Sequence, residues 1–178
     1  EDCSIYQNGS EIVSSSKDAK KRILEGLEKV LKNKYHKIDY VKTFINKAED
    51  ISVILRNPQQ SMFDDIFATD SNGLALKEVF DFIKDEKTWQ RKVTMSSLTT
   101  KFGRAPYGYR ANDVRGLVAT LLHAEKLKAK ISDQLQNIHS QNFIWEFSHG
   151  SQYERIVIEI QTEVDPQNPN PRGAHGGD

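Results

Sequence analysis

The fold of this chain is decided by Phe102-Gly-Arg-Ala-Pro-Tyr-Gly-Tyr-Arg110. Pro106 fixes its own φ angle and Gly108 tolerates a positive one, so this stretch predicts a tight turn and not a continuous helix. Tyr107 and Tyr109 can hold the turn against neighbouring helices. A rigid turn between two helices is typical of a helix-turn-helix.

The residues on both sides of this turn predict helices. Residues 94–102 form a short helix with Leu98 and Phe102 facing inward, and Gly103 ends it. After the turn, Asp113 can cap a second helix. Its apolar residues recur at helical spacing, namely Val114, Leu117, Val118, Leu121 and Leu122.

Beyond residue 125 the period of the apolar residues changes from 3.6 to 2, which indicates strands. Three alternating stretches predict three strands, at 126–131, 143–148 and 156–161, and residues 148–151 form a hairpin turn between the last two. A small antiparallel sheet after two helices completes a winged helix-turn-helix.

The first half of the chain has helical periodicity. Residues 17–32 and 39–55 each carry one apolar stripe, so we expect two helices that pack on each other as a hairpin. Residues 57–73 are polar but hold Met62, Phe63, Ile66 and Phe67, which predicts a packed loop or short helix. A third helix covers residues 74–83.

These elements predict an α+β fold that is mainly helical. An N-terminal helical hairpin or bundle precedes a winged helix-turn-helix with a small antiparallel sheet. We expect four parts: a flexible lead (1–15), a helical subdomain (16–90), a winged-helix-like domain (91–164) and a disordered tail (165–178). The tail has three prolines and no hydrophobic residue larger than alanine.

Composition limits the classes of protein to which the chain can belong. Its 25 Lys and Arg balance 25 Asp and Glu, which weakens any case for tight nonspecific nucleic-acid binding. Cys3 is the only cysteine, so an intramolecular disulfide and a thiolate metal cage are excluded. The apolar runs are too short to span a bilayer. We therefore expect a cytoplasmic protein that does not engage a membrane.

The sequence lacks the motifs of the common catalytic and metal sites. No Gly-Lys-Ser/Thr follows a glycine-rich turn, so there is no P-loop. Residues 70–73 match part of a calcium loop, but Ala68 and Val79 fall where ligands are required. The five histidines lack the spacing of a metal site. We expect a noncatalytic protein that needs no cofactor or metal.

Basic residues gather in the predicted winged helix: Lys101, Arg104, Arg110, Arg115, Lys126, Lys128 and Lys130. All of these except Lys101 form a predicted phosphate-binding set for duplex DNA, with Arg110 and Arg115 at the start of the recognition helix and the later lysines on the wing. The alternative is that the alternating lysines only keep an exposed strand soluble and block edge pairing.

Residues 102–128 resemble a segment of the C-terminal region of the large P-loop ATPases of BREX-type bacteriophage-resistance systems. Those proteins share a phenylalanine, a Pro-Tyr-Gly-aromatic turn, an aspartate that caps a helix, and a leucine-rich helix that runs into a strand. The motif is matched by Pro106, Tyr107, Gly108 and Asp113, whose roles would be structural. This chain departs from it with Tyr109 in place of a common tryptophan and Ala105 in place of a common proline.

The resemblance implies a bacterial winged-helix region separated from its ATPase motifs, none of which has a counterpart here. It would engage duplex DNA or other subunits of an antiviral defence complex. The alternative is a protein–protein interaction or oligomerisation module without nucleic-acid affinity. Exposed apolar residues between 16 and 56 would favour that alternative.

Overall fold

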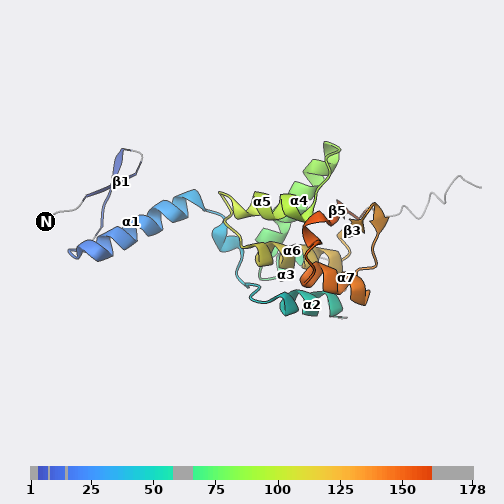
Figure 1. The fold of residues 1–178 in the computed structure, drawn as a ribbon. Helices are drawn as coiled ribbons and strands as arrows, with labels where there is room; N and C mark the ends of the chain where they lie inside the picture. Colours follow the sequence, from blue (N-terminus) through green and yellow to red (C-terminus); the bar gives the residue numbers. More distant parts are fainter. Residues whose placement is uncertain (1–3, 8, 15, 58–65, 162–178) are drawn as a thin grey trace, which may run out of the picture.

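The computed structural model describes residues 4–7, 9–14, 16–57 and 66–161. Helices dominate, and the strands form small antiparallel sheets (Figure 1). The predicted fold class, α+β and mainly helical, is confirmed. The tail predicted to be disordered lies outside the described residues.

The winged helix-turn-helix is built from three helices and two of the strands: α4 (Gly73–Thr88), α5 (Met95–Gly103), α6 (Ala111–His123), β3 (Leu127–Ile131) and β5 (Val157–Ile160). Strand β5 pairs antiparallel with β3. A bridge between Thr94 and Val157 brings the chain that precedes α5 alongside β5. The sheet is thereby tied to both ends of the helix-turn-helix.

The start of α5 is fixed by reciprocal capping. The hydroxyl of Thr94 accepts from the backbone N–H of Ser97 at 3.2 Å, and the hydroxyl of Ser97 accepts from that of Thr94 at 2.9 Å. This arrangement satisfies two backbone donors that the first turn would otherwise leave free. The helix includes Gly103, one residue beyond the predicted end.

The predicted strand at 143–148 is wrong, because these residues form helix α7 (Gln141–Ser148). The hydroxyl of Ser140 caps it by accepting from the backbone N–H of Phe143. Phe143, Ile144 and Phe147 are buried, which is helical spacing, whereas Trp145 is exposed. The third strand is instead β4 (Gln134–Leu135), which pairs with β3 and gives the sheet order β4-β3-β5.

The two N-terminal helices, α1 (Ala19–Lys34) and α2 (Ala48–Arg56), do not pack as the predicted hairpin. Figure 1 shows α1 pointing away from the body, whereas α2 lies beside α6 and α7. A 3-10 turn, η1 (Ile38–Tyr40), separates them. Helix α2 buries Ile51 and Leu55 and packs on α6 and α7 instead of on α1.

The segment predicted to be a flexible lead contains a hairpin of β1 (Ile5–Gln7) and β2 (Ser10–Ile12). Strands this short show no recognisable alternation of apolar and polar residues, so the sequence did not predict them. The hairpin lies on α1 at Gly26. A Cβ at Gly26 would lie 2.7 Å from the terminal side-chain carbon of Ile5, so a larger residue there would require Ile5 to shift.

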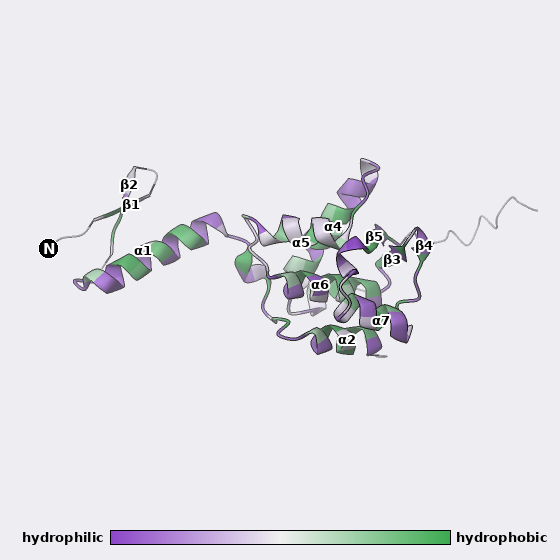
Figure 2. Ribbon diagram, viewed as in Figure 1, coloured by the Kyte–Doolittle hydropathy of each residue, from purple (hydrophilic) through white to green (hydrophobic). Residues whose placement is uncertain are grey.

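Helix α6 lies at the centre of the hydrophobic core. Every residue from Asp113 to His123 is buried, and α2, α4, α5 and β3 contact this helix. The short helix α3 (Ile66–Thr69) packs on α4. Residues on both sides of the predicted boundary near residue 90 share one core. Figure 2 shows apolar residues in the body and a further row along α1.

We expect Phe102→Ala to destabilise the protein by about 3–5 kcal/mol, because it leaves a cavity in the centre of an aromatic cluster. Phe102 is fully buried, and its ring centroid lies 4.6 Å from that of Tyr107 and 5.8 Å from that of Phe82. Urea denaturation followed by circular dichroism measures the change. The control is Trp89→Ala, since Trp89 is 70% exposed; equal stabilities of the two variants would contradict this account of the core.

Candidate functional site

The corner between α5 and α6 is a closed turn held by backbone hydrogen bonds. The N–H of Tyr109 donates to the carbonyl of Phe102 at 2.8 Å, and the N–H of Tyr107 donates to that of Arg104 at 2.9 Å. Gly108 has a φ of 72°, and a Cβ there would lie 2.8 Å from the ring of Tyr35. Glycine is therefore required both by the backbone conformation and by the close approach.

Side-chain contacts pin this corner to α4 and to the chain after α1. Glu78 of α4 accepts from Lys37 Nζ at 2.6 Å and from the hydroxyl of Tyr107 at 2.8 Å. The backbone N–H of Lys37 donates to the carbonyl of Pro106 at 3.0 Å. Burial raises the pKa of Glu78, but the hydrogen bonds from Lys37 and Tyr107 outweigh it and leave that pKa below its usual value. Pro106, Tyr107 and Gly108 thus lie where they hold the corner.

Asp113 is buried at the start of α6 and joins that helix to the segment before α2. Its carboxylate accepts from Arg110 Nε at 2.7 Å and from the backbone N–H of Ile45 at 2.8 Å. Arg110 also lies over the ring of Phe44, with the guanidinium carbon 5.0 Å from the ring centroid. Although Arg110 is exposed, these contacts already hold its guanidinium.

Arg115, which belongs to the predicted phosphate-binding set, is buried, with 7% of its surface exposed. Its Nη2 donates to the carbonyls of Phe147 and Ser148 at 2.5 and 2.6 Å. The guanidinium carbon lies 3.9 Å from the ring centroid of Tyr153. Arg115 therefore ties α6 to the end of α7 inside the body.

The helix in the recognition position, α6, is covered by neighbouring elements. Helix α2 packs along it, and a Cβ added to Gly116 would lie 2.4 Å from a side-chain carbon of Ile45. A DNA-reading helix-turn-helix presents its second helix to the major groove. In this arrangement α6 has no free face from Asp113 to His123 to present.

The remaining predicted phosphate contacts lie in different environments. Lys128 and Lys130 flank Glu159 of β5, with Nζ to carboxylate distances of 3.6 and 2.8 Å. Lys126 is half-buried before β3, and Arg104 is exposed at the end of α5. The structure brings Lys128 and Lys130 together on either side of Glu159, whose single negative charge offsets one of their two positive charges.

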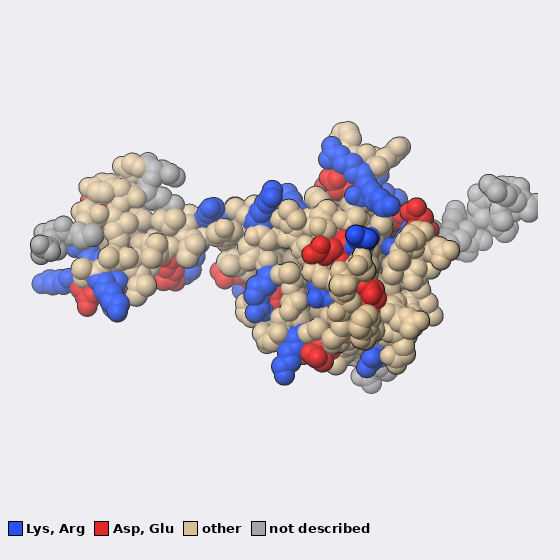
Figure 3. Space-filling model, viewed as in Figure 1, with Lys and Arg blue, Asp and Glu red and all other residues tan. Residues whose placement is uncertain are grey.

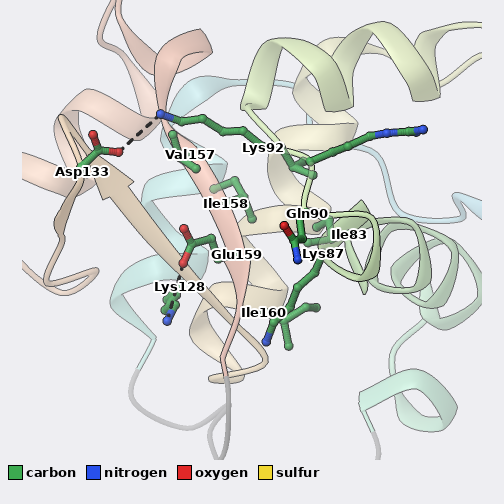
Figure 4. Close-up of a pocket in the computed structure, with 12 residues that line it drawn as sticks. Ile83, Lys87, Gln90, Lys92, Lys128, Asp133, Val157, Ile158, Glu159 and Ile160 are labelled. Carbon is green, nitrogen blue, oxygen red and sulfur yellow. Dashed lines mark hydrogen bonds and ion pairs between the residues drawn. The ribbon is translucent and has the colours of Figure 1, made fainter. Parts of the chain in front are cut away.

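A cleft of about 420 Å³ separates the end of α4 from β5 (Figure 4). Four basic side chains line it, Lys87, Arg91, Lys92 and Lys128, together with Asp133 and Glu159. Lys92 reaches Asp133 at 3.4 Å. Figure 3 shows Lys and Arg side chains gathered near the end of α4, with acidic side chains among them. This cleft could take an anionic group, although its charge is mixed.

Sequence reasoning missed Lys87, Arg91 and Lys92 as neighbours of the wing. Their link to it is the backbone of Val93, whose carbonyl accepts from the N–H of Ile158 at 3.0 Å. That pairing joins segments far apart in the sequence. The only available signal was the concentration of basic residues directly after a helix.

The described parts of the chain bring no three His, Cys, Asp or Glu side chains together in a way that could hold a metal ion. In those same parts every helix is too short or too polar to span a bilayer. The segment with a partial calcium-loop pattern serves the fold, since Asn72 Oδ1 accepts from the backbone N–H groups of Lys42 and Thr43 at 2.7 and 2.9 Å.

Comparison with known proteins gives a family match. The model of a family described as the winged helix-turn-helix domain of the BREX ATP-binding protein BrxC matches residues 37–162, which is more than half of the chain. The matched residues include α2 to α7 and the sheet, whereas α1 and the β1–β2 hairpin lie outside them. No solved structure matches the chain.

We expect Arg115→Ala to lower the free energy of unfolding by about 1.5–3 kcal/mol, because it leaves two buried carbonyls without a charged donor. Arg104→Ala removes an exposed arginine and should change stability by less than about 0.5 kcal/mol. Chemical denaturation of both variants tests this. Wild-type stability of the Arg115 variant would show that this side chain is not structural.

Acidification should destabilise the protein through His123. Burial lowers the pKa of this imidazole, and the neighbouring His139 lowers it further, whereas Glu125 opposes the change. The unfolded chain therefore binds a proton more readily than the folded one, and stability is lost as the pH falls below about 6.5. His123→Leu should flatten the loss measured by urea denaturation between pH values of about 6.5 and about 5. The exposed His36→Gln is the control and should leave that slope unchanged.

Proposed function

The chain belongs to the family of winged helix-turn-helix domains of the BREX ATP-binding protein BrxC, and from that membership we propose that it is a noncatalytic module that engages partner subunits of a BREX defence assembly. The assembly would act against phage in the bacterial cytoplasm. The family match concerns a winged helix and not an ATP-binding domain, which supports a binding role.

The burial of α6 is the observation that carries this proposal. A helix-turn-helix that reads DNA bases needs side chains of its second helix free to reach the groove. Here Asp113 and Arg115, which would stand at the start of that helix, are 3% and 7% exposed and engaged inside the body. Major-groove readout by α6 would require α2 and residues 43–47 to move away.

Exposed apolar residues of the N-terminal part also support a protein partner. Ile23, Leu24, Leu27 and Leu31 of α1 are each about half exposed, on a helix that projects from the body (Figure 2). Contiguous apolar surface of this kind is typical of interaction sites. Exposed apolar residues in this part of the chain are what the sequence analysis expects of a protein-interaction module.

A second candidate function, contact with the phosphate backbone of duplex DNA, is favoured by the cleft between α4 and β5. Lys87, Arg91, Lys92 and Lys128 could meet phosphates there. Glu159 and Asp133 lie among them and reduce the local positive charge. Such binding would be nonspecific and sensitive to salt.

We expect the purified chain to form a complex with the ATP-binding part of a BrxC protein or with sibling BREX subunits in size-exclusion chromatography with light scattering. Duplex DNA should bind weakly at about 50 mM salt and not detectably at about 200 mM. The combined change of Lys87, Arg91 and Lys92 to alanine should remove the weak binding. The control is Lys29→Ala, at an exposed residue of α1 outside the cleft.

Two results would count against the proposal. Absence of any complex with BREX subunits would remove the partner-engaging role. DNA binding that survives moderate salt and discriminates between sequences would favour the DNA role instead.

A further inference from the structure

We infer that α1 and the corner at 103–108 form a docking groove for an acidic amphipathic helix of a partner protein. The inference rests on the proposed partner-engaging function and names the chemistry of the segment that would be engaged. It concerns a surface distinct from the cleft between α4 and β5.

The groove is lined by residues of α1, of η1 and of the corner. Leu24, Leu27 and Leu31 of α1 form one side, and Ile38 of η1 with Gly108 of the corner forms the other; the volume is about 660 Å³. The three leucines are 54–58% exposed and Ile38 is 41% exposed. Glu28 and Lys32, which pair with each other, also line the groove, so it is a mainly apolar groove with one ion pair that the described residues leave open.

The spacing of the leucines fits a helical occupant. Leu24, Leu27 and Leu31 recur at i, i+3 and i+7, so they lie in a row along two turns of α1. An amphipathic helix with apolar residues at the same intervals could lay one face along this row. The β1–β2 hairpin covers α1 at Gly26, where Ile5 packs, so the leucine row is the side that remains available.

The charge of α1 indicates that the occupant of the groove is acidic. Helix α1 carries six basic residues and two acidic ones, Glu25 and Glu28. Both acidic side chains have partners within the chain, because Glu25 accepts from Ser14 and Glu28 pairs with Lys32 at 2.8 Å. A partner helix with acidic residues beside its apolar face would meet the basic rim favourably.

The same charges disfavour a second copy of α1 as the occupant. The basic residues occupy both ends of the helix: Lys20, Lys21 and Arg22 at the start, and Lys29, Lys32 and Lys34 towards the end. Parallel or antiparallel pairing of two copies would therefore place basic side chains against basic side chains, which is unfavourable.

A lipid surface fits the groove less well than a helix does. The apolar row faces a second wall at Ile38 and Gly108, so a flat bilayer could not reach along it. Residues 19–34 also contain no Trp or Phe, which interfacial helices commonly use as anchors. The observations thus favour a protein segment over a membrane.

The test uses a fluorescein-labelled synthetic peptide of about 18 residues, or five helical turns, with leucines at i, i+3, i+4 and i+7 and glutamates on the flanks. Fluorescence anisotropy with the full chain should give saturable binding with one site. Leu27→Ser combined with Leu31→Ser should weaken it at least about tenfold. Leu135→Ser is the matched control, since Leu135 is 66% exposed on β4 and should not alter affinity.

A peptide with lysines in place of the glutamates should bind at least about tenfold more weakly. Circular dichroism of the double variant should match the wild type, which separates lost contact from lost folding. Failure of the acidic peptide to bind, or equal binding of both peptides, would overturn the inference.

Three further outcomes would also overturn it. These are binding to phosphatidylglycerol vesicles in place of the peptide, a dimer in light scattering that the double variant abolishes, and a complex with BREX subunits that the double variant leaves intact. The last would leave the proposed function standing. Peptide binding without any complex would instead support the groove and count against the proposed function.

Discussion

The burial of α6 against α2 is the constraint on which the rest of the structure depends. Once α2 covers the outer side of this helix, its polar residues must find partners inside the protein. Asp113 is satisfied by Arg110 and by the backbone N–H of Ile45, and Arg115 is satisfied by two carbonyls at the end of α7. The charges that a DNA-reading helix would expose thus hold α2, α6 and α7 together, and unpaired they would be costly at these positions.

Because α6 is buried, the side chains that could bind a partner lie at the edges of the winged helix. The corner at 103–108 is fixed from both sides, by Glu78 of α4 and by the chain around Lys37, so it can form one wall of the groove beside α1. At the other end of the body, the backbone pairing of Val93 with Ile158 brings the basic end of α4 next to the wing. The winged helix therefore serves as a rigid support, with the groove beside α1 at one end and the basic cleft beside the wing at the other.

The sequence predicted the parts of the fold that are encoded locally and missed those set by tertiary packing. The turn at 105–108 and the apolar period of 114–122 depend on nearby residues, and both were identified. The helix at 141–148 was mistaken for a strand because Phe143, Trp145 and Phe147 alternate; only the exposure of Trp145 and the burial of Ile144 separate the two interpretations. No local signal could place α2 on α6 in preference to α1, or bring Lys92 within reach of Asp133. The burial of Arg115 could not be predicted for the same reason, since charge alone does not reveal burial.

The two peripheral surfaces differ in what a partner gains by binding. At the wing, an anion must compete with Glu159 for Lys128 and Lys130 and with Asp133 for Lys92, so part of its attraction is spent on displacing existing pairs. At α1, Leu24, Leu27 and Leu31 lack apolar cover among the described residues, and each square ångström removed from water contributes about 25 cal/mol. The basic residues beside them add orientation and a faster encounter with an acidic partner. Apolar surface flanked by charge, as at α1, is typical of protein recognition, whereas the charge of the wing is partly compensated by Glu159 and Asp133. This difference supports the proposed protein partner.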